Sequence, residues 1–199
     1  MKRLTFVPLF LILALLAVSG CSKGDDIKMR DKNDPVVTME TSFGKMIFEL
    51  YPDVAPVHVD SFLARTDDGF YDSLLFFRVI KDFMIQSGDP NNNGTGGAGY
   101  NLKAEFNKLP HVEGTLSMAR GYAENSAGTQ FFVCLARNPK TEYLDGKYTV
   151  FGQLLKGFDV LQKIGSVPVK AQPTGEVSRP VDPVYLIKIY RSDTKGNPL

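Results

Sequence analysis

Residues 76–89 read FFRVIKDFMIQSGD, and this stretch carries the strongest indications of both fold and chemistry in the chain. Two apolar runs, 74–80 and 83–86, have the length of short strands and are separated by the polar pair Lys81 and Asp82. A loop rich in glycine and asparagine follows over residues 87–99. The pattern predicts two short strands that lead into an irregular loop.

Strand-like runs occupy most of the remaining chain. Residues 36–50 predict a hairpin, with a turn at 42–44 between two segments of alternating polarity. Further strand-like runs lie at 114–119, 130–135, 149–154 and 184–190. Two short helices are expected, one that starts near Pro56 and one over 157–164. Many short strands separated by turns predict a mainly β domain, either a barrel or a sandwich.

The composition fits one globular domain without a strongly charged face. Of the 199 residues, 43% are hydrophobic and 23% are charged, which is enough for one ordinary core. The formal net charge of +1 gives no electrostatic footprint for nucleic acid, so we expect no nucleic-acid partner. Two histidines and one thiol in the domain make no ligand cluster, so we expect neither a metal nor another cofactor.

The N-terminus is typical of an export signal rather than of a fold element. Lys2 and Arg3 precede an apolar run at 4–18, which is shorter than the roughly 20 residues that a membrane-spanning helix needs. Residues 18–21 read VSGC and resemble the bacterial lipobox, in which the cysteine is acylated after cleavage before it. An ordinary signal peptide that ends near a cysteine is the alternative.

These features divide the chain into four parts. We expect a lipoprotein signal peptide at 1–20, a lipid-anchored flexible tether at 21–34, a folded domain at 35–192 and a C-terminal tail at 193–199. Lipid on Cys21 would hold the protein on a membrane, since each buried methylene contributes about 0.8 kcal/mol. Ser22 rather than Asp follows the cysteine, which resembles the outer-membrane address of Gram-negative lipoproteins. The expected location is therefore the cell envelope, at the periplasmic face of the outer membrane.

Two features point to chemistry that their sequence context does not support. Cys134 lies in the apolar run 131–135 and is expected to be a small buried hydrophobe rather than a nucleophile. Residues 94–99 read GTGGAG and formally satisfy the dinucleotide-binding pattern GxGxxG. No strand directly precedes this loop and no convincing helix follows it, so a nucleotide site is disfavoured.

Four blocks, in order along the chain, resemble the cyclophilin family of peptidyl-prolyl cis/trans isomerases. They are FFRVIKDFMIQSGD at 76–89, LSMAR at 116–120, TQFFV at 129–133 and YLDGKYTVFG at 143–152. The similarity runs from about Val36 to Tyr190 and so covers the whole predicted domain. This resemblance implies a closed eight-stranded antiparallel β-barrel capped by two α-helices.

The resemblance also implies a site for proline-containing polypeptides, which we expect to be the substrates of a monomeric enzyme that assists the folding of exported proteins. Catalytic roles carry over to Arg78, Phe83 and Gln86. Substrate-binding roles carry over to Met84, Gly94, Ala119, Arg120, Gln130, Phe132, Tyr143, Leu144 and Tyr148.

The chemistry of these side chains suits rotation about an X-Pro bond, for which amide resonance sets a barrier of about 18–20 kcal/mol. The guanidinium of Arg78 is always charged and presents fixed donors, so it would bond the proline nitrogen best once twisting has freed the lone pair. The apolar members of the set would form a dry slot for the ring, and the two glutamines would hold the substrate backbone. Without the resemblance, Arg78 would be read as a structural ion-pair partner and the apolar residues as core.

Several positions depart from the common family pattern. Tyr143 stands where many eukaryotic members have Trp and many bacterial members have Phe, so weak cyclosporin sensitivity is expected. Phe77 and Tyr148 replace histidines that are common in eukaryotic members. Arg120 replaces a common Asn at a position expected to contact substrate through its backbone. None of these changes removes Arg78.

Two other functions stay open on the sequence. One is a peptide-binding holdase or adhesion module that uses the same groove without turnover. The other, which is less favoured, is a nucleotide-dependent enzyme built on the glycine loop.

Overall fold

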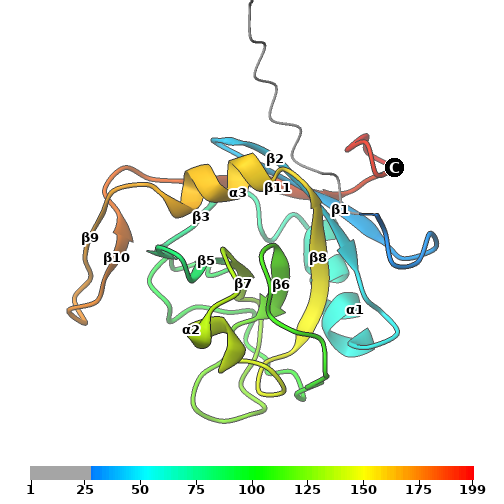
Figure 1. Ribbon diagram of the computed structural model, residues 1–199, viewed down its shortest axis with the longest axis horizontal. Coiled ribbons are helices and arrows are strands. Elements are labelled where there is room, and N and C mark those ends of the chain that lie inside the picture. Colours follow the sequence, from blue (N-terminus) through cyan, green and yellow to red (C-terminus); the bar gives the residue numbers. More distant parts are fainter. Residues whose placement is uncertain (1–27) are drawn as a thin grey trace, which may run out of the picture.

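The computed structural model of the protein describes residues 28–199. Over this part of the chain, the backbone forms one nine-stranded antiparallel sheet, a separate two-stranded hairpin and three helices (Figure 1). The sheet consists of β1 (Val36–Thr41), β2 (Gly44–Leu50), β3 (Leu74–Leu75), β4 (Arg78–Ile80), β5 (Met84–Ser87), β6 (Thr115–Met118), β7 (Phe131–Cys134), β8 (Val150–Lys156) and β11 (Tyr185–Arg191). The helices are α1 (Pro56–Asp67), α2 (Pro139–Glu142) and α3 (Phe158–Gly165), and the hairpin pairs β9 (Val169–Ala171) with β10 (Val177–Pro180). The predicted mainly β fold is confirmed.

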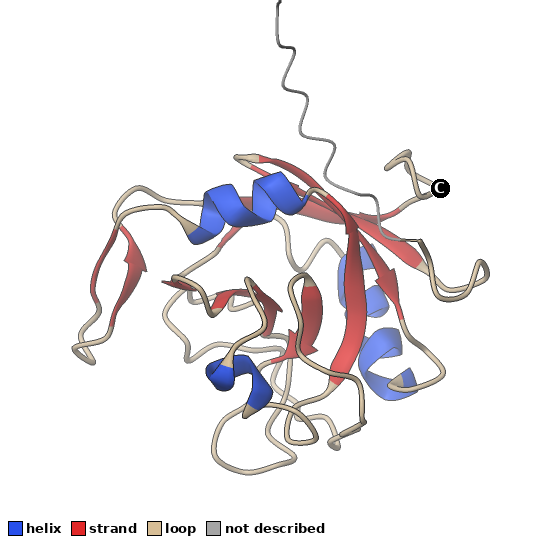
Figure 2. Cartoon of the chain, viewed as in Figure 1, coloured by secondary structure: helices blue, strands red, loops and turns tan. Residues whose placement is uncertain are grey.

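The sheet is strongly curled (Figure 2), and its strand order is β3-β11-β1-β2-β8-β6-β7-β5-β4. Its two edge strands, β3 and β4, are consecutive in the chain and are separated by Phe76 and Phe77 alone. The pairings of residues 28–199 include no ladder between β3 and β4, so the predicted closed barrel of eight strands is not confirmed. The structure has nine strands in an open order, with a covalent link between the two edges.

One predicted strand and the predicted number of helices differ from the structure. The run 74–80 is divided because Phe76 donates its N–H to Val184 O at 2.9 Å, whereas Arg78 already pairs with β5. The two predicted helices correspond to α1 and α3, and α2 is an additional single turn. Asn138 caps α2 by accepting the N–H of Lys140 at 2.9 Å. The sequence analysis did not predict α2 or the β9–β10 hairpin.

The centre of the core is a cluster of buried aromatic rings beneath α1. Phe62 of this helix lies 5.0 Å from the ring of Tyr71, 5.6 Å from Phe131 and 5.2 Å from Phe151, measured between ring centroids. All four side chains are buried, and edge-to-face or tilted contacts of this kind favour close packing. The cluster fixes α1 and β7 relative to each other.

Alternation along β5 and β7 places two sets of side chains on opposite faces of the sheet. Ile85 and Phe131 belong to the main core, whereas their neighbours Met84 and Phe132 belong to a second, smaller apolar cluster. Since successive side chains of a strand point to opposite faces, the same short strands serve both the core and an outer pocket. This arrangement positions the candidate site.

The chain segments next to the domain make contacts of their own. The backbone N–H groups of Arg30 and Asp31 each donate to the Glu49 carboxylate at 2.9 Å, and the Arg30 guanidinium lies 4.0 Å from the Tyr51 ring centroid. At the other end, Leu199 donates its N–H to Arg191 O at 3.1 Å. The predicted signal peptide, Cys21 and residues 22–27 of the tether lie outside the described residues. The domain boundaries at 20, 34 and 192 stay predictions. No helix within 28–199 combines the length and apolar character needed to cross a bilayer.

Candidate active site

Most of the predicted site residues line one cavity, which lies on the face of β4, β5 and β7 opposite the main core. The cavity has a volume of about 230 Å³. Its lining residues are Arg78, Phe83, Met84, Gln86, Ala119, Arg120, Phe132, Leu144 and Tyr148. All of them were predicted from the sequence. The fold brings them together from segments that are up to 70 residues apart. We call this the proline cavity below, after the ring that the resemblance predicts it to bind.

The floor of the proline cavity is apolar and closely packed. Met84, Phe132 and Leu144 are almost completely buried and pack together with Phe83. The Tyr148 ring meets the Phe132 ring edge-on at a centroid distance of 5.9 Å. A concave pocket that combines apolar walls with a few placed polar groups, here Arg78, Gln86 and Arg120, is the usual form of a small-ligand site.

Arg78 supplies the charged group of the cavity from the edge strand β4. Its Nη1 donates to Gln86 Oε1 at 3.0 Å, and Gln86 is its direct partner across the β4–β5 pairing. Its Nε and Nη2 donate to the two carboxylate oxygens of Glu176, at 2.7 and 2.8 Å. This bidentate bond to Arg78 lowers the pKa of Glu176 to about 2. Arg78 is therefore both an ion-pair partner and a member of the pocket, and the two interpretations left open by the sequence are compatible.

The two predicted glutamines form a chain of hydrogen bonds beside Arg78. Gln86 Nε2 donates to Gln130 Oε1 at 3.0 Å, and Gln130 Nε2 donates to the carbonyl oxygens of Gly94 at 3.2 Å and Gly96 at 2.9 Å. Both N–H donors of the Gln130 amide are thus used within the protein, since a side-chain amide has two. Gln86 keeps one N–H, so it is the amide that can donate to a bound peptide backbone.

Gly94 and Gln130 line a second cavity that adjoins the first. This larger cavity has a volume of about 710 Å³ and shares Arg78, Gln86, Ala119 and Arg120 with the proline cavity. The two cavities together form a continuous groove with an apolar end and a polar end. An extended peptide has room there on one side of a bound proline ring.

The glycine- and asparagine-rich loop at 87–99, the glycine loop, forms part of the wall of this groove. The buried carboxylate of Asp89 accepts the backbone N–H groups of Asn91, Asn93 and Gly94 and so holds the loop in shape. The element after this loop is the strand β6 rather than a helix. Because a pyrophosphate is bound at a helix N-terminus in dinucleotide folds, the loop lacks the context for nucleotide binding.

Of two further predicted substrate-binding residues, Arg120 lies at the groove and Tyr143 does not. Arg120 lines both cavities, but its guanidinium is folded back, 4.7 Å from the Tyr148 ring centroid and 3.1 Å from Lys147 O. Tyr143 lines neither cavity and is 67% exposed, with the Lys147 ammonium 3.5 Å from its ring centroid. The structure therefore places Tyr143 outside the groove that the other residues form.

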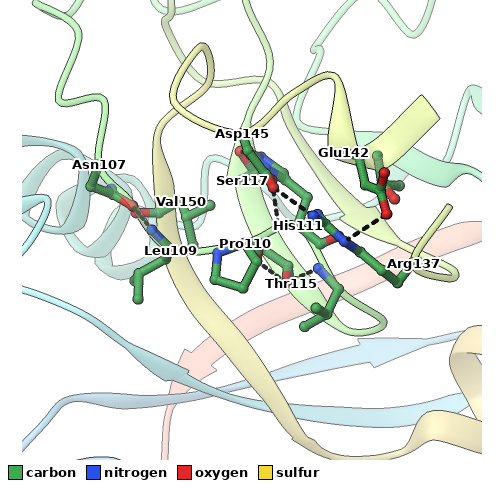
Figure 3. Close-up of polar contacts among 12 residues, drawn as sticks. Asn107, Leu109, Pro110, His111, Thr115, Ser117, Arg137, Glu142, Asp145 and Val150 are labelled. Atoms are coloured by element: carbon green, nitrogen blue, oxygen red, sulfur yellow. Dashed lines mark hydrogen bonds and ion pairs between the residues drawn. The ribbon is translucent and has the colours of Figure 1, made fainter. Parts of the chain in front are cut away.

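A buried polar network supports the proline cavity from behind. Figure 3 shows His111 between Asp145 and Ser117, with Nδ1 at 3.0 Å from Asp145 Oδ1 and Nε2 at 3.0 Å from Ser117 Oγ. Arg137 binds the other oxygen of the same carboxylate at 2.8 Å. The His111 ring stacks on Phe132 with a centroid distance of 5.9 Å and an angle of 13° between the planes. The network thus fixes the aromatic floor of the cavity.

This network has the connectivity of a hydrolase triad but lacks its accessibility. Ser117 and His111 have no exposed surface, and Ser117 Oγ donates to Thr149 O at 3.0 Å. A nucleophile must reach its substrate, so this serine is structural. Cys134 is completely buried, as predicted, and burial raises the pKa of its thiol to about 12, the opposite of the shift that activates a cysteine nucleophile. Among residues 28–199, no group of three or more potential ligands is placed to hold a metal ion.

The network predicts that the domain loses stability as the pH falls. Burial lowers the pKa of His111 below its usual 6.5, so the unfolded chain binds a proton that the folded chain does not. The free energy of unfolding should therefore decrease from pH 8 to pH 5, by at most about 1.4 kcal/mol per pH unit. Urea unfolding at each pH measures this change. A flat profile over this range would contradict it, and His111→Asn should flatten the profile.

A second decrease is expected at lower pH. Burial raises the pKa of Asp145, but hydrogen bonds from Arg137 and His111 outweigh it and hold this pKa well below its usual range. The stabilisation from a carboxylate with a depressed pKa is present above about pH 4 and is lost as the pH falls further. The same titrations extended to pH 3 should show this second decrease.

The sequence analysis missed the residues that the β9–β10 hairpin contributes. Gln172, Thr174 and Glu176 line the larger cavity together with Phe77. The hairpin strands are only three and four residues long, which is too short for a periodic signal. Glu176 in particular had no feature that distinguishes it from any surface glutamate.

Comparisons with known proteins identify the family of the chain. Residues 36–191 match the family model described as cyclophilin type peptidyl-prolyl cis-trans isomerase/CLD. The chain is 41% identical to the peptidyl-prolyl cis-trans isomerase-like 1 of Neurospora crassa over 157 residues, which cover 76% of this chain and 91% of the relative. It is 45% identical to a peptidyl-prolyl cis-trans isomerase of Synechococcus elongatus over 115 residues, which cover 58% of this chain and 77% of the relative.

A solved structure shows the same fold. The cyclophilin-type isomerase of Cryptosporidium parvum, crystallised in the presence of the dipeptide Ala-Pro, superimposes with a TM-score of 0.70 at 30% sequence identity. The superposition covers 80% of this chain and 99% of that one. The chain therefore belongs to the cyclophilin family and is a peptidyl-prolyl cis-trans isomerase.

Proposed function

We propose that the protein accelerates X-Pro rotation by binding the proline ring in the proline cavity and donating a hydrogen bond from Arg78 to the proline nitrogen. The observation that carries this proposal is the position of the Arg78 guanidinium, which lines the cavity beside the apolar floor and donates to Gln86 at 3.0 Å. A planar amide nitrogen is a poor acceptor, because its lone pair is conjugated with the carbonyl. The twisted nitrogen becomes pyramidal and accepts well, so the bond forms best in the transition state.

The energies are consistent with a useful rate enhancement. A hydrogen bond from a charged donor that is made only in the twisted state and contributes about 3–4 kcal/mol accelerates rotation by roughly two to three decades. A proline ring seated on the apolar floor of Met84, Phe132 and Leu144 would exclude water there and so strengthen this bond. No covalent bond is broken, so neither a nucleophile nor a general base is required.

Catalysis itself is measured by the cis-to-trans conversion of a proline tetrapeptide. Residues 22–199 should raise the rate well above the uncatalysed rate, which has a time constant of tens to hundreds of seconds. A folded protein that gives no acceleration would contradict the proposal. The groove would then serve for peptide binding without turnover.

We also propose that the natural substrates are exported polypeptides that the enzyme meets at the cell envelope. The support is the apolar run at 4–18 and the lipobox-like VSGC at 18–21, followed by Ser22. In this proposal the lipid on Cys21 anchors the chain to the periplasmic face of the outer membrane. The polar segment after the cysteine leaves the domain free to reach its substrates.

Metabolic labelling with a fatty acid tests the anchor in a Gram-negative host. The full chain should incorporate the label and sediment with outer membranes, and Cys21→Ser should abolish both. Cys134→Ser serves as the matched control, because this cysteine is buried in β7 and should leave the labelling unchanged. Labelling that survives Cys21→Ser would contradict acylation at this position.

A further inference from the structure

Arg78 carries a bond that the proposed mechanism does not use. Glu176, which lies between β9 and β10, accepts Nε and Nη2 of Arg78 in a bidentate pair at 2.7 and 2.8 Å. The hairpin therefore reaches back to the edge strand that supplies the catalytic arginine. The pair is partly shielded, with 30% of the Arg78 side chain and 37% of the Glu176 side chain exposed.

The hairpin itself holds the carboxylate in place. Ser178, which is fully buried, donates its Oγ–H to Glu176 Oε2 at 2.7 Å. Gln172 Nε2 donates in turn to Ser178 Oγ at 2.6 Å. With Gln86 and Gln130 on the other side, Arg78 is the centre of a hydrogen-bond chain that runs from the hairpin to the glycine loop. Side chains fixed at both ends in this way keep their geometry during a reaction.

We infer that Glu176 is a positioning residue for Arg78, an inference that rests on the proposed function. Glu176 and Gln86 together accept three of the five N–H donors of the guanidinium and fix the orientation of its plane. Two donors remain for the substrate, and Arg78 lines the proline cavity where they are needed. Without Glu176, the guanidinium would be free to rotate about its long side chain, and a smaller fraction of molecules would hold the productive geometry.

The place of the carboxylate favours this role over inhibition. Glu176 lines the larger cavity and is absent from the lining of the proline cavity. It occupies the Nε–Nη2 side of the guanidinium and so leaves the pocket for the ring open. A blocking carboxylate would have to lie in the proline cavity itself.

Kinetics of the full chain in detergent separate a positioning role of Glu176 from an inhibitory one, because its removal should lower kcat in the first case and raise kcat in the second. Glu176→Ala should lower kcat about tenfold, and Glu176→Gln, which keeps a neutral acceptor, about threefold, with KM within twofold of the original value in both. Ser178→Ala removes the support of the carboxylate and should lower kcat about twofold. The control is Asp67→Ala, because Asp67 forms a comparable bidentate pair with Arg191 on the surface and lies outside both cavities. Its kcat should be unchanged.

A double variant tests whether Glu176 acts through Arg78. Adding Glu176→Ala to Arg78→Ala should cause no further loss of kcat, because a positioning residue has no effect once its partner is gone. An unchanged or increased kcat in Glu176→Ala alone, or an equal loss in both backgrounds, would overturn the inference. An inactive wild type, or an Arg78→Ala variant with full activity, would instead overturn the proposed function. The two failures are therefore distinguishable.

Discussion

Replacing Arg78 by alanine is expected to lower kcat/KM for a proline tetrapeptide by about 100- to 1,000-fold, because the transition state loses a charge-assisted hydrogen bond. Arg78 lies on an edge strand and its side chain is 30% exposed, so the fold should survive the change. Arg78→Lys should also be strongly impaired, since an ammonium lacks the planar fork that bonds Gln86, Glu176 and substrate together. A protease-coupled assay or NMR measures the rates.

Arg191→Ala is the matched control for this experiment. Arg191 forms the same kind of bidentate pair, with Asp67, and lines neither cavity. Its kcat/KM should remain within twofold of the wild type. An Arg78→Ala variant that keeps more than a third of the activity would contradict the mechanism. If this variant loses turnover but still binds the peptide, the groove has a binding capacity that is separable from catalysis.

Phe131 and Phe132, which are adjacent in β7, are expected to affect different properties when each is replaced by alanine. Phe132 should affect mainly activity and Phe131 mainly stability. Phe132→Ala should lower kcat/KM about 10- to 100-fold, because it removes the floor of the proline cavity. Phe131→Ala should cost about 3–5 kcal/mol of unfolding free energy, because this ring packs against Phe62 and Tyr71 in the core. The strand alternation that separates the two faces is the physical reason for the difference.

The comparison needs both activity and stability for each variant. Urea unfolding gives the free energy, and kcat/KM is measured at low temperature, where both variants are folded. Phe131→Ala should keep its activity within a few-fold and Phe132→Ala should not, although it is the less destabilised of the two. Equal losses of activity would mean that the pocket and the core are not separate units. Phe131→Leu and Phe132→Leu provide milder versions of the same test.

The residues that line the proline cavity were identified through the family resemblance, because they belong to long blocks that match the family pattern. Met84 and Gln86 are two residues apart in β5 and Phe132 is the cross-strand partner of Gln86, so alternation places these three on one face, whereas Phe83 precedes the strand. Arg78 was identified together with its neighbours for the same reason. The mainly β fold and the helices at α1 and α3 followed from composition and spacing.

The remaining features depend on contacts between distant segments, which no local pattern reveals. Arg78 and Glu176 are 98 residues apart, and His111 and Asp145 are 34 residues apart. The break in the run 74–80 arises because Phe76 bonds to Val184 at the far end of the chain. Tyr143 belongs to a family block, yet it lies outside the groove because the chain turns there after α2. Tertiary structure decides each of these.

The central claim is that this chain uses Arg78 to speed rotation of a bound proline. NMR exchange spectroscopy measures it directly, because cross-peaks between the cis and trans forms of a proline peptide report the rate of interconversion. Catalytic amounts of the wild type should produce exchange within a second, compared with tens to hundreds of seconds for the free peptide. Arg78→Ala should still shift the peptide resonances through binding but leave the exchange at the uncatalysed rate. Absence of exchange with the wild type, or equal exchange with both proteins, would contradict the claim.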